Sequence, residues 1–133
     1  MKLEHVGIAV KNLEQSNLLF KKLFGQAVYK SEFVASEGVE TSFFQLGETK
    51  VELLEGNDPQ GAIAKFINKR GEGIHHLAFE VEDIQYEIER LQSEGFEFVQ
   101  ERPKEGADNK RICFLHPKST NGVLIELCQE IKE

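Results

Sequence analysis

The sequence predicts an α+β protein made of two tandem βαβββ modules that together form a curved sheet. Two observations lead to this fold class: the chain repeats itself, and each half follows the order strand, helix, three strands. The whole chain, residues 1–133, is expected to be a single domain. Module 1 covers about 3–55, a linker covers about 56–73, and module 2 covers about 74–129.

The composition is typical of a globular protein that needs no membrane. Charged residues make up 29% of the chain and hydrophobic residues 40%, and 133 residues are enough to bury a core. The net charge of −7 argues against nucleic acid as a partner. No apolar run approaches the roughly 20 residues of a membrane span, and the chain opens without a signal-peptide pattern. We therefore expect a protein of the cytoplasm, or of a compartment similar to an organelle matrix, with no membrane partner.

The repeat is clearest in two segments, "LEHVGIAVKNLEQSNLLFKKLFG" at 3–25 and "IHHLAFEVEDIQYEIERLQSEG" at 74–95. Each has a short apolar strand followed by an amphipathic helix. Capping residues fit both ends of each helix, with Asn or Asp at the start and Gly at the stop. These positions are Asn12, Gly25, Asp83 and Gly95.

The remaining elements complete the two halves. Strands are predicted at 27–34, 39–46, 49–56, 96–100, 111–115 and 122–129, a hairpin turn at 46–49, and a short linker helix at 62–68.

Two adjacent histidines, His75 and His76, lie in the first strand of module 2. Successive strand residues face opposite sides of a sheet, so both cannot serve one site. His75 shares its face with bulky apolar residues, and we expect a structural role. His76 shares its face with the small Ala78, just as His5 does with Gly7, so His76 is the candidate for chemistry.

A glutamate accompanies each of these histidines. Glu52 and Glu126 lie 74 positions apart, and His5 and His76 lie 71 positions apart, so all four are repeat-matched. Two imidazoles and two carboxylates suit a divalent transition metal and disfavour a soft-metal or iron–sulfur site. The sequence therefore predicts that the curved sheet surrounds a metal site with His5, Glu52, His76 and Glu126 as ligands. Four protein ligands on an octahedral ion leave two positions for water or substrate.

The two cysteines, Cys113 and Cys128, lie in apolar runs and are interpreted as reduced core thiols. A disulfide between them stays open at this stage.

Three motifs carry a resemblance to a known family. They are "HVGIAVKNL", "KRGEGIHHLAFEV" and "FLHPKSTNGVLIEL", and the likeness runs from about residue 3 to 129. Together with the repeat and the His/Glu spacing, they resemble the vicinal oxygen chelate superfamily, which includes glyoxalase, bleomycin resistance and dioxygenase proteins. Within it they look like the methylmalonyl-CoA epimerases.

The resemblance implies a fold, a reaction and partners. The reaction would be metal-dependent epimerisation of (2R)- and (2S)-methylmalonyl-CoA, by proton abstraction at C2 and reprotonation through a metal-stabilised enolate. The cofactor would be a divalent ion of cobalt, manganese, nickel or zinc. The partner would be an acyl-CoA substrate, and the family suggests a homodimer.

Inversion at C2 needs an acid–base group on each side of the carbon. Glu126 is our first choice for one, and Glu52 is a candidate for the other. Some relatives place an acid at the position aligned with Thr41, and Glu40 is one residue away, where it would face the wrong side without a bulge. We also expect Lys118 and Ser119, in the "HPKST" loop before the last strand, to bind the substrate's anionic end.

Two other functions are open. One is a glyoxalase I type lactoylglutathione lyase, which also uses a His/Glu metal site for proton transfer. The other is a non-catalytic small-molecule-binding protein of the same fold. Such proteins commonly lose the metal ligands, whereas this chain keeps all four.

Overall fold

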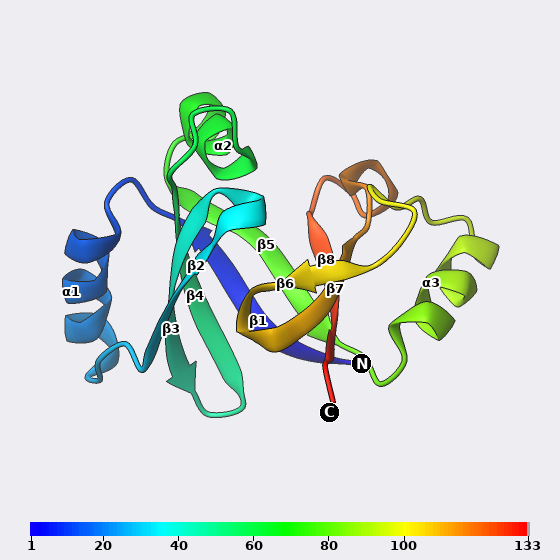
Figure 1. Cartoon of the computed structure of the whole chain (residues 1–133), viewed down its shortest axis with the longest axis horizontal. Coiled ribbons are helices and arrows are strands. Elements are labelled where there is room, and N and C mark those ends of the chain that lie inside the picture. Colours follow the sequence, from blue (N-terminus) through cyan, green and yellow to red (C-terminus); the bar gives the residue numbers. More distant parts are fainter. Residues whose placement is uncertain (133) are drawn as a thin grey trace. The chain divides into compact units, whose positions relative to one another are not determined.

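A computed structural model describes residues 1–132 of the chain (Figure 1). Contacts divide it into two compact units, residues 5–75 and residues 1–4 together with the chain from residue 76. Module 1 contains β1 (Lys2–Ala9), α1 (Leu13–Phe24), β2 (Lys30–Val34), β3 (Val39–Leu46) and β4 (Thr49–Gly56). The linker holds α2 (Ala62–Arg70). Module 2 contains β5 (Gly73–Glu80), α3 (Ile84–Ser93), β6 (Lys104–Gly106), β7 (Lys110–Phe114) and β8 (Ile125–Glu130).

The predicted fold class is confirmed, because the two modules have the same strand topology. The strand order is β2-β3-β4-β1 in module 1 and β5-β8-β7-β6 in module 2. In each module the first strand runs parallel to the last, and the other pairings are antiparallel. The chain is therefore an α+β protein of two βαβββ modules.

The core of module 1 lies between its sheet and α1 (Figure 1). Leu13 and Phe24 of α1 pack with Val10, which directly follows β1, with Phe44 of β3 and with Leu53 of β4. Leu53 is next to Glu52 on β4, and Phe44 pairs with Val51, which is also next to Glu52. Both therefore lie on the face opposite to that of Glu52. The helix thus covers one face of the sheet, and the other face carries His5 and Glu52 beside a second apolar cluster that includes Leu54 of β4 and Ile63 of α2.

Module 2 repeats this arrangement with α3. Ile84 and Ile88 are buried and pack with Cys113 of β7 and Leu127 of β8. Fully burying one such side chain contributes about 1.5–3 kcal/mol, so α3 is fixed on its sheet mainly by this apolar face.

Each helix start is held by a side chain from the last strand of its module. Asn12 and Asp83 cap α1 and α3, as predicted. In addition, the carboxylate of Glu55 accepts a hydrogen bond from Leu13 N at 2.6 Å, and the amide oxygen of Gln129 accepts one from Ile84 N at 2.8 Å. These residues lie three positions after Glu52 and Glu126, on the opposite strand face. One strand therefore fixes a helix on one side and presents a glutamate on the other.

The predicted strand at 96–100 is wrong. Phe98 forms only an isolated bridge with Leu115, and the strand that pairs with β7 on the side away from β8 is β6, at Lys104–Gly106. Phe96 and Phe98 pack against the α3 core, and this packing produced the apolar alternation. The β6 strand consists of exposed and half-exposed residues at the end of the strand order, so it carries no apolar pattern.

Other boundaries differ by a few residues. The β2 strand begins at Lys30 rather than at 27, β8 covers Ile125–Glu130 rather than 122–129, and α2 extends to Arg70. The α3 helix ends at Ser93, and the predicted stop Gly95 has a φ of 97° just beyond it.

Cys113 and Cys128 are free and buried. Ile112 pairs with Cys128 and Cys113 with Leu127, so the two thiols point to opposite faces of module 2. Burial raises the pKa of the Cys113 thiol to about 11.

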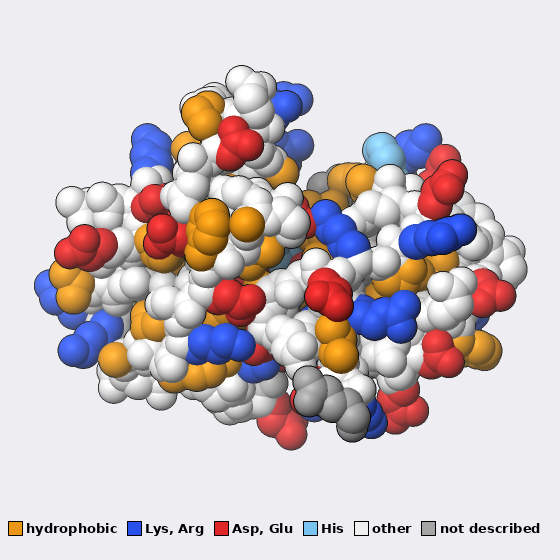
Figure 2. All heavy atoms as spheres, in the orientation of Figure 1, with side chains coloured by type: hydrophobic (Ala, Val, Ile, Leu, Met, Phe, Trp, Pro, Cys, Tyr) orange, Lys and Arg blue, Asp and Glu red, His pale blue; other side chains and the backbone are white. Residues whose placement is uncertain are grey.

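Within residues 1–132, no helix has the length and hydropathy of a membrane span. Figure 2 shows acidic and basic side chains interspersed over the face in view.

Candidate metal site

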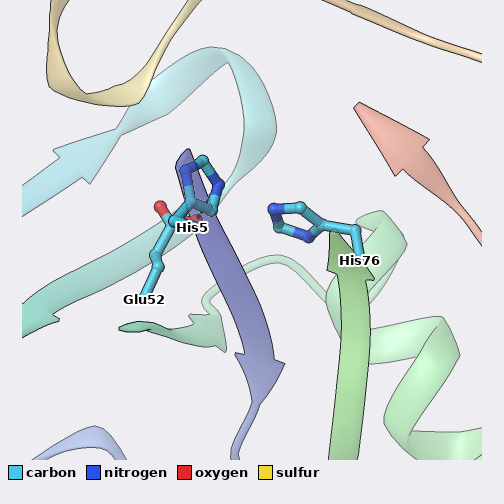
Figure 3. Close-up of side chains that lie close together, drawn as sticks. All are labelled: His5, Glu52 and His76. Carbon is cyan, nitrogen blue, oxygen red and sulfur yellow. Dashed lines mark ion pairs between the residues drawn. The ribbon is translucent and has the colours of Figure 1, made fainter. Parts of the chain in front are cut away.

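The first His/Glu pair lies in module 1 (Figure 3). His5 is on β1 and Glu52 on β4, and His5 Nε2 lies 3.3 Å from Glu52 Oε1. Both residues are buried, with exposed fractions of 6% and 3%. The register pairs Gly7 with Glu52, which puts His5, two positions earlier on β1, on the same face.

The second pair has the same construction in module 2. His76 is on β5 and Glu126 on β8, and His76 Nε2 lies 3.4 Å from Glu126 Oε1. Both are buried, and Ala78 pairs with Glu126 as Gly7 does with Glu52. The small residues predicted beside each histidine therefore lie against the glutamate strand.

Each glutamate also lies beside a phenylalanine that the sequence analysis did not single out. Phe43 on β3 is the cross-strand partner of Glu52, and Phe114 on β7 is the partner of Glu126. Phe114 meets the ring of His76 edge-on, with ring centroids 5.9 Å apart. Such aromatic contacts restrict ring orientation, so Phe114 positions the His76 imidazole.

His75 lies on the other face of β5. Its ring packs edge-on against Phe66 of α2, with centroids 5.0 Å apart. This packing agrees with the structural role expected from strand alternation.

The two pairs have different surroundings. In module 1, Lys30 Nζ lies 5.7 Å from the Phe43 ring centroid and 3.7 Å from a carboxylate oxygen of Glu32. In module 2, the buried Lys110 lies with its Nζ 3.9 Å from a carboxylate oxygen of Glu80. Cys128, two positions after Glu126, has its thiol pKa raised by burial and then by the nearby carboxylates of Glu126 and Glu4.

His5, Glu52 and His76 form a buried group that could hold a metal ion (Figure 3). Their imidazole nitrogens and carboxylate oxygen are ligands that zinc, cobalt, nickel and manganese accept. Metal binding requires neutral imidazole and ionised carboxylate, and a buried carboxylate in turn needs a compensating cation. The residues present therefore fit a divalent ion.

The structure also places the two residues considered near the second acid–base position. Glu40 pairs with Glu55, on the face away from Glu52. Thr41 pairs with Leu54, on the face of Glu52; it is fully buried, and its hydroxyl donates to the carbonyl of Glu32. The absence of a bulge between β3 and β4 in this register explains why Glu40 points away.

Lys118 and Ser119 lie against the segment before β6. Lys118 Nζ is 3.0 Å from a carboxylate oxygen of Glu97, and Ser119 Oγ accepts a hydrogen bond from Glu97 N. They line a surface hollow of about 420 Å³ together with Phe96 and Glu97. Their expected contact with substrate stays a prediction.

Comparison with known proteins gives the family. The profile of the glyoxalase/bleomycin resistance protein/dioxygenase superfamily matches residues 4–114. The chain belongs to this superfamily.

Individual relatives show which members of the superfamily this chain is similar to. A mitochondrial methylmalonyl-CoA epimerase of Dictyostelium discoideum is 42% identical over 95% of this chain and 76% of its own length. The Bacillus subtilis protein YqjC, whose name assigns no activity, is 34% identical over 96% of this chain and 91% of its own length.

Solved structures agree with this result. Methylmalonyl-CoA epimerase from Mycobacterium tuberculosis has a TM-score of 0.94 at 34% identity, covering 98% of this chain and 89% of that one. A methylmalonyl-CoA epimerase in complex with methylmalonyl-CoA and ammonium has a TM-score of 0.93 at 30% identity, covering 97% and 94%.

Proposed function

We propose that this protein is a metal-dependent methylmalonyl-CoA epimerase. The observation that carries the proposal is the presence of two buried His/Glu pairs with the same register in both modules. The relatives named as epimerases support the choice of substrate.

We propose that the two pairs act as one site, with His5, Glu52, His76 and Glu126 as metal ligands. Two carboxylates supply two negative charges, which balance a divalent cation in a buried setting. A bound ion of cobalt, manganese, nickel or zinc would stabilise negative charge on the thioester oxygen.

The reaction requires a proton to leave C2 and another to arrive on the opposite side. The C2 hydrogen lies between a thioester and a carboxylate and is weakly acidic. Glu126 and Glu52 are the carboxylates that we assign to its removal and return. Neither Thr41, which has no titratable group, nor Glu40, which lies on the other face of β3, fits this role better.

The two phenylalanines beside the glutamates suit this chemistry. Phe43 is almost fully buried, so water has little access to Glu52 from the β3 side. A carboxylate with fewer competing waters interacts more strongly with a neighbouring proton or cation.

The test combines metal analysis with an epimerisation assay in deuterated water. We expect about one divalent ion per chain, turnover of both epimers, and deuterium at C2 of the product formed from either epimer. A single base that shuttles its own proton would return part of the original hydrogen. Turnover of a glutathione hemithioacetal without epimerisation would favour the lyase instead.

The expected homodimer is a further part of this proposal. Light scattering of the purified protein should give twice the chain mass of 15.1 kDa.

A further inference from the structure

Module 1 carries two lysines on the face of Glu52. Lys30 on β2 is the cross-strand partner of Phe43, which is in turn the partner of Glu52, so the three form one row across β2, β3 and β4. Lys50 lies two positions before Glu52 on the same strand and therefore on the same face. It is also the cross-strand partner of His5.

The Lys30 side chain lies across the sheet rather than extending away from it. Its ammonium is 5.7 Å from the centroid of the Phe43 ring, which is itself 1% exposed. Strands are spaced about 4.8 Å apart, so the backbones of Lys30 and Glu52 are about 10 Å apart in this row. An ammonium over the intervening ring is within reach of a ligand bound at Glu52.

This ammonium has a nearby carboxylate and is still accessible. Glu32 lies 3.7 Å from it, and the Lys30 side chain is 38% exposed. A solvent-exposed ion pair of this kind is weak and exchanges readily with another anion. The Phe43 face adds a cation–π contact that orients the ammonium without neutralising it.

Module 2 repeats one of these lysines, but in another row of the sheet. Lys104 on β6 corresponds to Lys30 and is exposed, yet it pairs with Ile112 and so lies in the row of Cys128 rather than in that of Glu126. The position that corresponds to Lys50 is Leu124, and the lysine on the Glu126 face of β7 is Lys110, which is buried with Glu80. Among the strands described, an accessible lysine in the row of the glutamate itself is thus a feature of module 1.

We infer that Lys30 and Lys50 form an anion subsite of module 1 that takes an anionic oxygen group of an acyl-CoA ligand. The group is either the carboxylate of the acyl part or a phosphate of CoA. The choice of an acyl-CoA rests on the proposed function, whereas the anion chemistry rests on the two lysines.

Binding measurements on the metal-loaded protein test the subsite without requiring turnover. The probes are malonyl-CoA, propionyl-CoA, which lacks the carboxylate, and malonyl-pantetheine, which lacks the phosphates. The test variant is Lys30→Gln, and Lys30→Arg should retain affinity. The matched control is Lys22→Gln, which removes one exposed positive charge from α1.

We expect Lys30→Gln to weaken malonyl-CoA binding about tenfold, equivalent to about 1.4 kcal/mol. If the subsite takes the carboxylate, the substitution weakens the binding of malonyl-pantetheine by the same factor and leaves the binding of propionyl-CoA unchanged. If the subsite takes a phosphate, the substitution weakens the binding of propionyl-CoA by the same factor and leaves the binding of malonyl-pantetheine unchanged. The double variant Lys30→Gln with Lys50→Gln should lose more of the affinity for malonyl-CoA than the single variant. Glu32→Gln should tighten malonyl-CoA binding, because a competing anion is removed.

The subsite is overturned if Lys30→Gln binds all three probes as Lys22→Gln does, or if the unaltered protein binds none of them. Failure of the proposed function is a separate result: the wild-type protein would show the Lys30-dependent binding and no epimerisation.

Discussion

Module 1 and module 2 hold equivalent His/Glu pairs in different surroundings. The pair distances are 3.3 Å and 3.4 Å, and the register beside each glutamate is the same. Around the first pair, however, a lysine lies over the phenylalanine, whereas around the second pair the phenylalanine packs against the histidine itself. The duplicated backbone therefore preserves the pair, while the neighbouring side chains differ. We expect Phe114 of module 2 to fix the orientation of the His76 ring, and Lys30 of module 1 to contact the ligand.

The largest expected effect separates the two histidines of β5. His76→Ala should remove most of the bound metal and all measurable epimerisation, since a ligand is lost. His75→Ala should keep its metal and lose only packing against Phe66. Metal content by elemental analysis checks both, and equal retention in the two variants would refute the alternation argument.

The next comparison is between the two glutamates. Glu126→Gln and Glu52→Gln should each slow epimerisation by about 10²–10⁴-fold, the usual contribution of a general acid or base. In deuterated water each variant should still exchange the C2 hydrogen of one epimer, and the two variants should differ in which one. Metal content must be measured in the same samples. A Glu126→Gln protein with its metal and its full rate would leave Glu126 as a ligand only.

Alkaline pH should act on module 2, which contains both cysteines. Burial raises the Cys113 pKa from 9.0 to about 11, so the folded state disfavours the thiolate. The stabilisation is complete below pH 9 and is lost as the pH rises through 11, by roughly 3 kcal/mol at about 1.4 kcal/mol per pH unit. Denaturant unfolding between pH 8 and 11 measures the loss, and Cys113→Ala should make it smaller. An unchanged slope with pH in that variant would place the effect elsewhere.

A smaller difference is expected between the two phenylalanines. Phe114→Leu and Phe43→Leu should each destabilise the fold by about 1–2 kcal/mol, less than the 3–5 of truncation to alanine. Only Phe114→Leu should also weaken metal binding, by several-fold, because Phe114 contacts the His76 ring. Metal titrations of both variants, with thermal melts as the folding control, decide this. A greater loss of metal affinity in Phe43→Leu would reverse the assignment.

The smallest effects concern the helix starts. Glu55→Ala and Gln129→Ala should each cost about 1 kcal/mol, since each leaves a helix-start amide without its side-chain acceptor. Glu55→Gln should recover most of the loss, because an amide oxygen accepts the same bond in module 2. Hydrogen exchange should locate the change in α1 for Glu55 and in α3 for Gln129. Uniform exchange across both helices would contradict this local view.

Much of the fold could be predicted because local patterns specify it. Asn12 and Asp83 cap the helix starts as predicted, and strand alternation correctly separated His75 from His76. The β6 strand could not be predicted, because "KEG" has no apolar alternation and forms only through pairing with β7.

The side chains that surround the candidate site could not be predicted from the sequence either. Phe43 follows a serine and precedes another phenylalanine, and only the register with β4 shows which ring lies beside Glu52. The helix contacts of Glu55 and Gln129 join residues 42 and 45 positions apart. Such partners depend on tertiary packing and leave no local pattern.

The segment that leads into the short β6 strand indicates where this chain tolerates a change in length. His5 and Glu52 are 47 positions apart, whereas His76 and Glu126 are 50 apart, and both pairs close to nearly the same distance. Module 2 therefore accommodates three extra residues between its histidine and its glutamate. The stretch between α3 and β6, where Glu101 and Arg102 are exposed, is where we expect such insertions to be tolerated. An epitope tag or a new pair of chain ends introduced there should leave both pairs intact.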